Sequence, residues 1–186
     1  MYLSRRSILQ IVFDLAAGFE RDPDFALHLA LSWQNGSIAD FSAFGEKAFT
    51  LDTSERGFGA LAVSRIFALK RQLRGYIVKH GIRSVLNLMP HVWSGNLVRI
   101  IQDAGARYFT IIHDAQPHPG DRTGLVHKLL MRDAYKAGGV FTLSRHVTDS
   151  LVSGVRIKPQ RITTLFLPNT GNPRTNALPV PAADQP

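Results

Sequence analysis

Two kinds of hydrophobic pattern alternate along residues 1–167. Short runs rich in β-branched and aromatic residues predict strands, and apolar residues spaced three or four apart predict helices. The predicted strands cover residues 25–33, 47–51, 84–89, 108–112, 140–143 and 161–167. The predicted helices cover residues 4–20, 54–80, 96–104, 123–136 and 144–153. This alternation is typical of βαβ units, and it predicts one α/β domain with a mostly parallel sheet and helices on both faces.

The strand at residues 108–112 is aromatic or β-branched throughout, without a polar face. That pattern is typical of a strand buried on both sides in a parallel sheet. Prolines and a glycine end the strand, and several polar residues follow it at once: His113, Asp114, Gln116, His118 and Asp121. Ligands of open α/β sheets bind beyond the carboxyl ends of the strands, so this segment is the candidate site.

A further histidine, His91, follows the predicted strand 84–89. If the two strands are neighbours, both ends open on one crevice. A neutral imidazole there could accept a proton from a hydroxyl nucleophile or bind a sugar hydroxyl or phosphate, and Asp114 could orient the ring. A buried structural role for His113 and a loop role for His118 remain open. A zinc or iron site of His113, Asp114 and His118 is a weaker alternative, because a loop rich in proline and glycine holds ligands poorly.

The formal charge of +8 indicates anionic partners, such as lipid headgroups, phosphorylated sugars or nucleic acid. Nucleic acid is disfavoured, because most aromatic residues fall on strands or core-facing positions. Basic residues gather in the helix at residues 55–80: Arg56, Arg65, Lys70, Arg71, Arg74 and Lys79. Such a helix could lie on an anionic membrane surface, although an ordinary solvated face fits equally well.

Several classes of site and segment are excluded or disfavoured. The sequence has no cysteine, which excludes disulfides and thiolate catalysis and fits a cytoplasmic protein. It has no G-x-G-x-x-G, no G-x-x-x-x-G-K-[ST] and no G-x-S-x-G pattern. Arg5-Arg6 precede an apolar stretch, as in a signal peptide, but the apolar residues follow one helical face and favour an amphipathic helix.

Three segments carry a family resemblance: IIHDAQPHPGD at residues 111–121, GGVFTLSRHVTDSL at 138–151 and RITTLFLP at 161–168. Together they resemble the N-terminal, acceptor-side half of family 4 glycosyltransferases, which have the GT-B fold. The resemblance implies a Rossmann-like domain in which His113 faces the acceptor and acts in catalysis. Ser144 would lead from a strand into a helix, and Pro168 would begin the link to a second domain. Asp22-Pro23-Asp24 matches a metal-nucleotide D-x-D pattern of many glycosyltransferases, but its place before a strand favours a turn.

The family transfers a hexose from a nucleotide-sugar to a lipid-linked or polysaccharide acceptor and needs no metal. By this resemblance, His91, Asp114, Gln116, His118 and Ser144 would line the acceptor site. The basic helix would hold the protein at the inner face of a membrane.

Two departures from the family qualify this function. The family binds the nucleotide-sugar mainly through a C-terminal domain, and it opens with a central strand before the first helix. Here residues 168–186 hold five of the ten prolines and predict a disordered tail, and the sequence begins at the helix. We therefore expect no sugar transfer without a donor-binding partner chain and no cofactor other than the donor. There are two alternatives for the function of this protein. It could be a non-catalytic module that binds an acceptor or a membrane and recruits such a chain, or it could be a truncated remnant.

Overall fold

The computed structural model describes residues 9–33, 38–53, 60–89, 94–114 and 131–165. Its first half contains α1 (Leu9–Arg21), β1 (Leu29–Ser32), the 3₁₀ segment η1 (Ile38–Lys47), β2 (Ala48–Leu51), α2 (Ala60–Lys79) and β3 (Ser84–Asn87). Its second half contains α3 (Ser94–Asp103), β4 (Arg107–Ile112), β5 (Gly139–Thr142), α5 (Arg145–Ser153), the 3₁₀ turn η2 (Pro159–Arg161) and β6 (Ile162–Thr164). Residues 131–136 are also helical.

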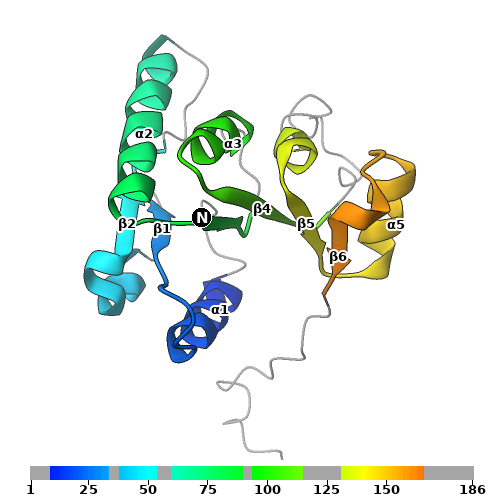
Figure 1. Ribbon diagram of the computed structural model, residues 1–186, viewed down its shortest axis with the longest axis horizontal. Coiled ribbons are helices and arrows are strands. Elements are labelled where there is room, and N and C mark those ends of the chain that lie inside the picture. Colours follow the sequence, from blue (N-terminus) through cyan, green and yellow to red (C-terminus); the bar gives the residue numbers. More distant parts are fainter. Residues whose placement is uncertain (1–8, 34–37, 54–59, 90–93, 115–130, 166–186) are drawn as a thin grey trace, which may run out of the picture.

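The described strands form two parallel sheets. One has the order β1-β2 and the other has the order β3-β4-β5-β6. All four strand pairings are parallel. In Figure 1, α2 and α3 lie above the strands and α1 lies below them. The α/β architecture with parallel strands and flanking helices, predicted from the hydrophobic pattern, is therefore confirmed.

Strand β4 is the centre of the larger sheet. It pairs with β3 along one edge and with β5 along the other. Tyr108, Thr110, Ile111 and Ile112 are all buried, and only Phe109 is half-buried within the apolar run. The prediction of a strand covered on both faces is confirmed.

Two hydrophobic clusters form the core of the described part of the chain. The larger one joins α2, α3, β4, residues 131–137 and α5, with fully buried residues such as Leu97, Ile101 and Leu151. The smaller one contains the buried residues Val12, Leu31 and Phe41. The larger sheet is thus packed mainly on the first cluster, and α1, β1 and η1 share the second.

Some element boundaries differ from the sequence prediction. Strand β1 begins at Leu29 rather than Phe25, because a turn at Asp22 holds the preceding residues. The Asp24 N–H donates to the Asp22 carboxylate at 3.0 Å, and the Phe25 N–H donates to the Asp22 carbonyl at 3.1 Å. These bonds support the turn interpretation of Asp22-Pro23-Asp24. Residues 123–130 of the predicted helix and the predicted tail 168–186 lie outside the described residues.

Candidate functional site

The carboxyl ends of β3, β4 and β5 lie side by side, because these strands are parallel neighbours. His113 directly follows β4, and Ser144 follows β5 after one residue. The two strands that carry the candidate histidines are therefore adjacent, as the sequence analysis required for a common crevice. His91, Gln116 and His118, also predicted for this site, lie outside the described residues.

His113 is half-buried and connects the ends of β3 and β4. Its Nε2 lies 2.9 Å from the carbonyl oxygen of Leu88. A carbonyl oxygen only accepts, so Nε2 carries the hydrogen and donates it. In the neutral ring the lone pair is then on Nδ1, which remains able to accept a proton. Asp114, the next residue, is exposed at the same edge.

Ser144 begins helix α5. Its backbone is extended (φ −156°, ψ 156°), and its hydroxyl oxygen accepts from the Val147 N–H at 3.3 Å. This is an N-cap, which satisfies one of the free amides of the first turn. Ser144 thus has a structural role at the position that the sequence analysis assigned to it, and its hydroxyl hydrogen can still be donated.

A chain of threonine hydroxyls ties the same edge together. The hydroxyl oxygens of Thr142 and Thr148 lie 2.6 Å apart, and those of Thr148 and Thr164 lie 2.7 Å apart. These contacts join β5, α5 and β6 directly beside the Ser144 cap. They fix the relative positions of the strand ends that form this edge.

A buried polar network lies beneath the edge, and sequence reasoning missed it. The Tyr108 hydroxyl donates to Oδ2 of Asp133 at 2.9 Å, and the Asn87 amide donates to the same oxygen at 3.1 Å. All three side chains are fully buried. Asn87 also donates to the Ser94 hydroxyl at 3.4 Å, which connects the end of β3 to the start of α3. The sequence signal was Asn87, a polar residue that interrupts the apolar residues at positions 85–89.

Burial governs the protonation of this network. It raises the pKa of Asp133 to about 6, although the hydrogen bonds from Tyr108 and Asn87 act in the opposite direction. Burial and the nearby Asp133 carboxylate raise the pKa of Tyr108 well above its usual value. Among the described residues, Oδ1 of Asn87, Oδ1 of Asp133 and Oγ1 of Thr110 have no hydrogen-bond partner. These buried oxygens therefore remain able to accept hydrogen bonds below the candidate site.

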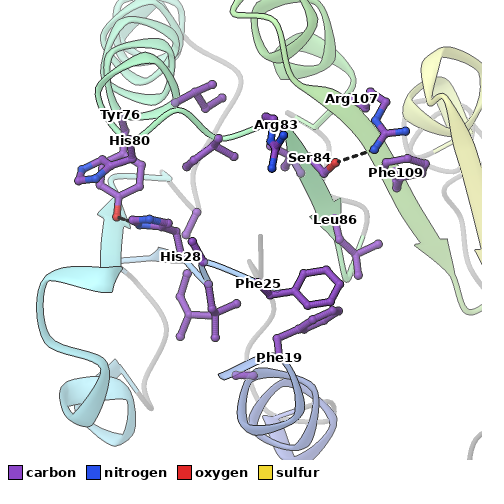
Figure 2. Close-up of a pocket in the computed structure, with 18 of the residues that line it drawn as sticks. Phe19, Phe25, His28, Tyr76, His80, Arg83, Ser84, Leu86, Arg107 and Phe109 are labelled. Atoms are coloured by element: carbon purple, nitrogen blue, oxygen red, sulfur yellow. Dashed lines mark hydrogen bonds between the residues drawn. The ribbon is translucent and has the colours of Figure 1, made fainter. Parts of the chain in front are cut away.

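A separate cavity of about 900 Å³ lies between β1 and β3. Residues of α1, β1, α2 and β3 line it, and neither His113 nor Ser144 does. Figure 2 shows His28, Tyr76 and His80 on one side, Arg83, Ser84 and Arg107 on the other, and Phe19 and Phe25 below. We call it the interstrand cavity. It is distinct from the edge at which the sequence analysis placed the site.

An aromatic group forms one wall of the interstrand cavity. Nδ1 of His28 lies 2.9 Å from the Tyr76 hydroxyl, and the rings of His28 and His80 lie 4.7 Å apart. Tyr76 stacks on Phe49 of β2 at 4.3 Å. Burial, followed by the charges of His80 and Lys47, lowers the pKa of His28. The neutral form of the His28 ring is therefore favoured.

Neither a metal centre nor a membrane span is found within the described ranges. There, no three acidic or imidazole side chains gather in a way that could hold a metal ion. The helices of the same part of the chain are all too short or too polar to cross a bilayer.

Comparison with known proteins identified similar solved structures. No protein-family model matches the sequence, and neither does a curated protein. The UDP-GlcNAc 2-epimerase from Methanocaldococcus jannaschii matches with a TM-score of 0.64 and 8% identity, over 87% of this chain and 43% of that one. A putative UDP-N-acetylglucosamine 2-epimerase from Listeria monocytogenes matches with a TM-score of 0.65 and 14% identity, over 86% and 43%. A glycosyltransferase from Rickettsia africae matches with a TM-score of 0.58 and 12% identity, over 88% and 41%.

These identities are low, so the likeness establishes the fold alone. The chain spans less than half the length of each of these proteins. The parallel strands, the flanking helices and the matched structures agree with one another: this chain has the Rossmann-like α/β fold of a GT-B-like domain.

Proposed function

We propose that this protein is the acceptor-binding half of a hexosyltransferase of the GT-B type, resembling family 4. The observation that carries the proposal is the position of His113 at the carboxyl end of the central strand, with Nε2 donating to Leu88. Sites of open α/β sheets lie at this edge. The similar solved structures include a glycosyltransferase and two enzymes named for a nucleotide-sugar, which supports sugar chemistry for this fold.

In this proposal His113 receives the acceptor hydroxyl at Nδ1. The Leu88 carbonyl holds the ring through Nε2, so the ring is oriented before the acceptor binds. The same carbonyl stabilises the imidazolium that forms when Nδ1 takes the hydroxyl proton. The Asp114 carboxylate and the Ser144 hydroxyl bind further sugar hydroxyls, together with His91, Gln116 and His118. The nucleotide-sugar donor is bound by a second, donor-binding domain or partner chain, so this chain alone binds an acceptor without transferring sugar.

The outer face of α2 supports a membrane-linked acceptor. Phe67 and Val78 are 66% and 60% exposed, and Arg71 and Arg74 lie between them on the chain. At 3.6 residues per turn, these four positions fall on one side of the helix. An exposed face of two apolar and two cationic side chains suits an anionic lipid surface. We therefore propose that α2 holds the domain against the membrane that carries a lipid-linked acceptor.

Calorimetric titration with methyl hexopyranosides tests the acceptor site. His113→Ala removes both the hydroxyl acceptor and the bond to Leu88, and we expect the affinity to fall about tenfold. The matched control is His146→Ala, because His146 is an exposed histidine on α5. Equal binding by both variants, or no hexoside binding by the wild type, would contradict the proposal.

Sedimentation with vesicles of anionic and neutral lipid tests the membrane face. Each basic residue near an anionic surface contributes about 1 kcal/mol, so Arg71→Ala/Arg74→Ala should weaken binding about 30-fold. The control Arg99→Ala/Arg145→Ala removes two exposed arginines from α3 and α5. The same loss for both double variants would mean that net charge alone, and not the face of α2, drives the binding.

A further inference from the structure

The interstrand cavity occupies a gap in strand order. Within the described residues, β1 pairs with β2 and β3 pairs with β4, but β1 and β3 are not paired with each other. The cavity is lined by both of these strands, with α1 and α2 beside them. Figure 2 shows the two sets of side chains facing each other across the open space. β1 and β3 therefore flank a space that no described strand fills.

Backbone groups on both sides of the gap point toward it. The Trp33 N–H donates to the Leu51 carbonyl of β2 at 2.8 Å, so alternate residues of β1 face β2. Ala30 lies an odd number of residues from Trp33, so its N–H and C=O face the opposite side of β1, toward the cavity. On β3, the Arg83 carbonyl accepts from the Arg107 N–H at 2.9 Å, so Ser84 directs its groups away from β4. The gap thus offers peptide donors and acceptors on opposite sides.

The side-chain lining is apolar, as the core of a sheet requires. It includes Val12 and Leu15 of α1, Leu29 of β1, Ile77 of α2 and Val85 of β3. Phe25, 53% exposed, lies against Phe19 with the ring centroids 5.0 Å apart. A polar ligand would not cover the apolar side chains well. An extended segment can cover them and can also form hydrogen bonds with the backbone groups on both sides.

One end of the cavity is cationic. Arg83 directly precedes β3 and Arg107 begins β4, so both stand at the amino ends of these neighbouring strands. Among the described residues that line the cavity, the one acidic side chain is Asp24, in the turn before β1.

We propose that the interstrand cavity receives an extended apolar strand from a partner protein, with acidic residues on the amino-terminal side of that strand. The strand pairs in parallel, as in every described pairing, and its acidic flank reaches Arg83 and Arg107. It joins the two sheets into one. Residues 1–8 contain Arg5 and Arg6 and no acidic residue, so this segment lacks the complementary charge.

Fluorescence anisotropy with labelled peptides tests this docking on the full chain. The probe carries two aspartates followed by five alternating valines and threonines. One comparison peptide has proline at the central valine, and the other has lysines in place of the aspartates. We expect micromolar binding of the probe and about tenfold weaker binding of each comparison peptide, because proline lacks a donor and lysine is repelled.

Paired variants locate the binding. Phe25→Asp should weaken probe binding about tenfold, whereas Tyr135→Asp, which changes an aromatic residue of similar exposure outside the cavity, should not. Arg83→Glu should reverse the preference in favour of the lysine peptide, and Arg99→Glu, at an exposed position on α3 outside the cavity, should leave it unchanged. Reversal by Arg83→Glu alone would establish the direction of the bound strand.

Three results would overturn the proposal. The first is no binding of the probe by the full chain. The second is binding that does not change when the central valine is replaced by proline, or when the flanking aspartates are replaced by lysines. The third is binding that occurs only after residues 1–7 are removed, since a segment of this chain would then be the occupant instead of a partner.

Discussion

The two sheets of this protein differ in how completely they are enclosed. Strand β4 has a neighbour along each edge and lies against a cluster of seventeen buried residues. Strand β1 has one described neighbour, borders the interstrand cavity and belongs to a cluster of three buried residues. Both sheets are parallel and their strands are similarly short, so strand type alone does not explain the difference. The helices account for the difference in enclosure, because α2, α3, α5 and residues 131–136 all pack on the larger cluster.

The larger sheet is a rigid scaffold, whereas the region around the interstrand cavity is a more adaptable surface. The candidate acceptor site lies on the enclosed sheet, where His113 and Ser144 are held by hydrogen bonds to fixed backbone groups. The interstrand cavity lies between the enclosed sheet and the smaller one. Regions with few buried contacts open at low free energy, and such regions are well suited to accept a partner. The predictions below compare the two regions, from the largest expected effect to the smallest.

Truncating a buried leucine in each cluster should give the largest difference. Leu97→Ala in the larger cluster should cost about 3–4 kcal/mol in the free energy of unfolding, because its enclosed surroundings cannot collapse. Leu31→Ala should cost about 2 kcal/mol, at the lower end of the range for a buried leucine, because Leu31 already borders the interstrand cavity. Urea unfolding of both variants measures this. Equal costs would remove the distinction between the regions.

The buried Asp133 should make the enclosed region less stable as the pH rises. Its pKa is raised from 3.8 to about 6, so the neutral form is favoured by folding. That contribution is complete below pH 3.8 and is lost between there and about pH 6. Asp133→Asn should therefore stabilise the protein at pH 7 by up to about 3 kcal/mol, with the gain vanishing near pH 4. Thermal unfolding of both proteins across this range measures it; a gain that is independent of pH would argue against titration of Asp133.

Loss of the Ser144 cap should have an intermediate effect. Ser144→Ala removes the acceptor for the Val147 N–H, and we expect a cost of about 1 kcal/mol. Ser144→Gly should cost only a few tenths of that amount, because glycine tolerates the N-cap conformation. The two variants compared by urea unfolding separate the cap from any role in sugar binding, which calorimetry reports independently. A negligible cost for alanine would mean that α5 does not depend on this bond.

The smallest effect should come from His28. Its contribution to stability is lost as the pH falls, whereas that of Asp133 is lost as the pH rises. Its pKa is lowered from 6.5, chiefly by burial, so folding favours the neutral ring. The stability that it contributes is present above pH 6.5 and is lost as the pH falls below that value. His28→Gln should therefore flatten the decline of melting temperature between pH 7 and pH 5 slightly. An unchanged decline would show that other groups cause it.

The sequence predicted the parts of the fold that depend on local pattern. The apolar run at Tyr108–Ile112 and the serine at position 144 carried enough information for the central strand and the start of α5. The separation of the strands into two sheets was not predictable in this way, since it depends on pairing between distant segments. The Asn87–Asp133 bond also joins residues 46 positions apart in sequence, and nothing local to Asp133 marked it.

The site was predicted less completely than the fold. His113 lies at the carboxyl end of β4 as expected, and Asp114 lies beside it. Periodicity does not indicate which carbonyl a histidine will meet, so the bond to Leu88 was found only in three dimensions. The interstrand cavity gave no sequence signal of its own, because its lining comes from α1, β1, α2 and β3.

Hydrogen exchange of the backbone amides, followed by mass spectrometry, tests most directly whether the enclosed sheet is the stable scaffold. We predict that peptides covering β4 and β5 exchange at least about a hundredfold more slowly than peptides covering β1 and β2. The probe peptide with the acidic flank should then slow exchange in β1 and β3 and leave β5 unchanged. Equal exchange in the two sheets, or slower exchange in β1 and β2, would contradict the division of this protein into an enclosed scaffold and an open docking region.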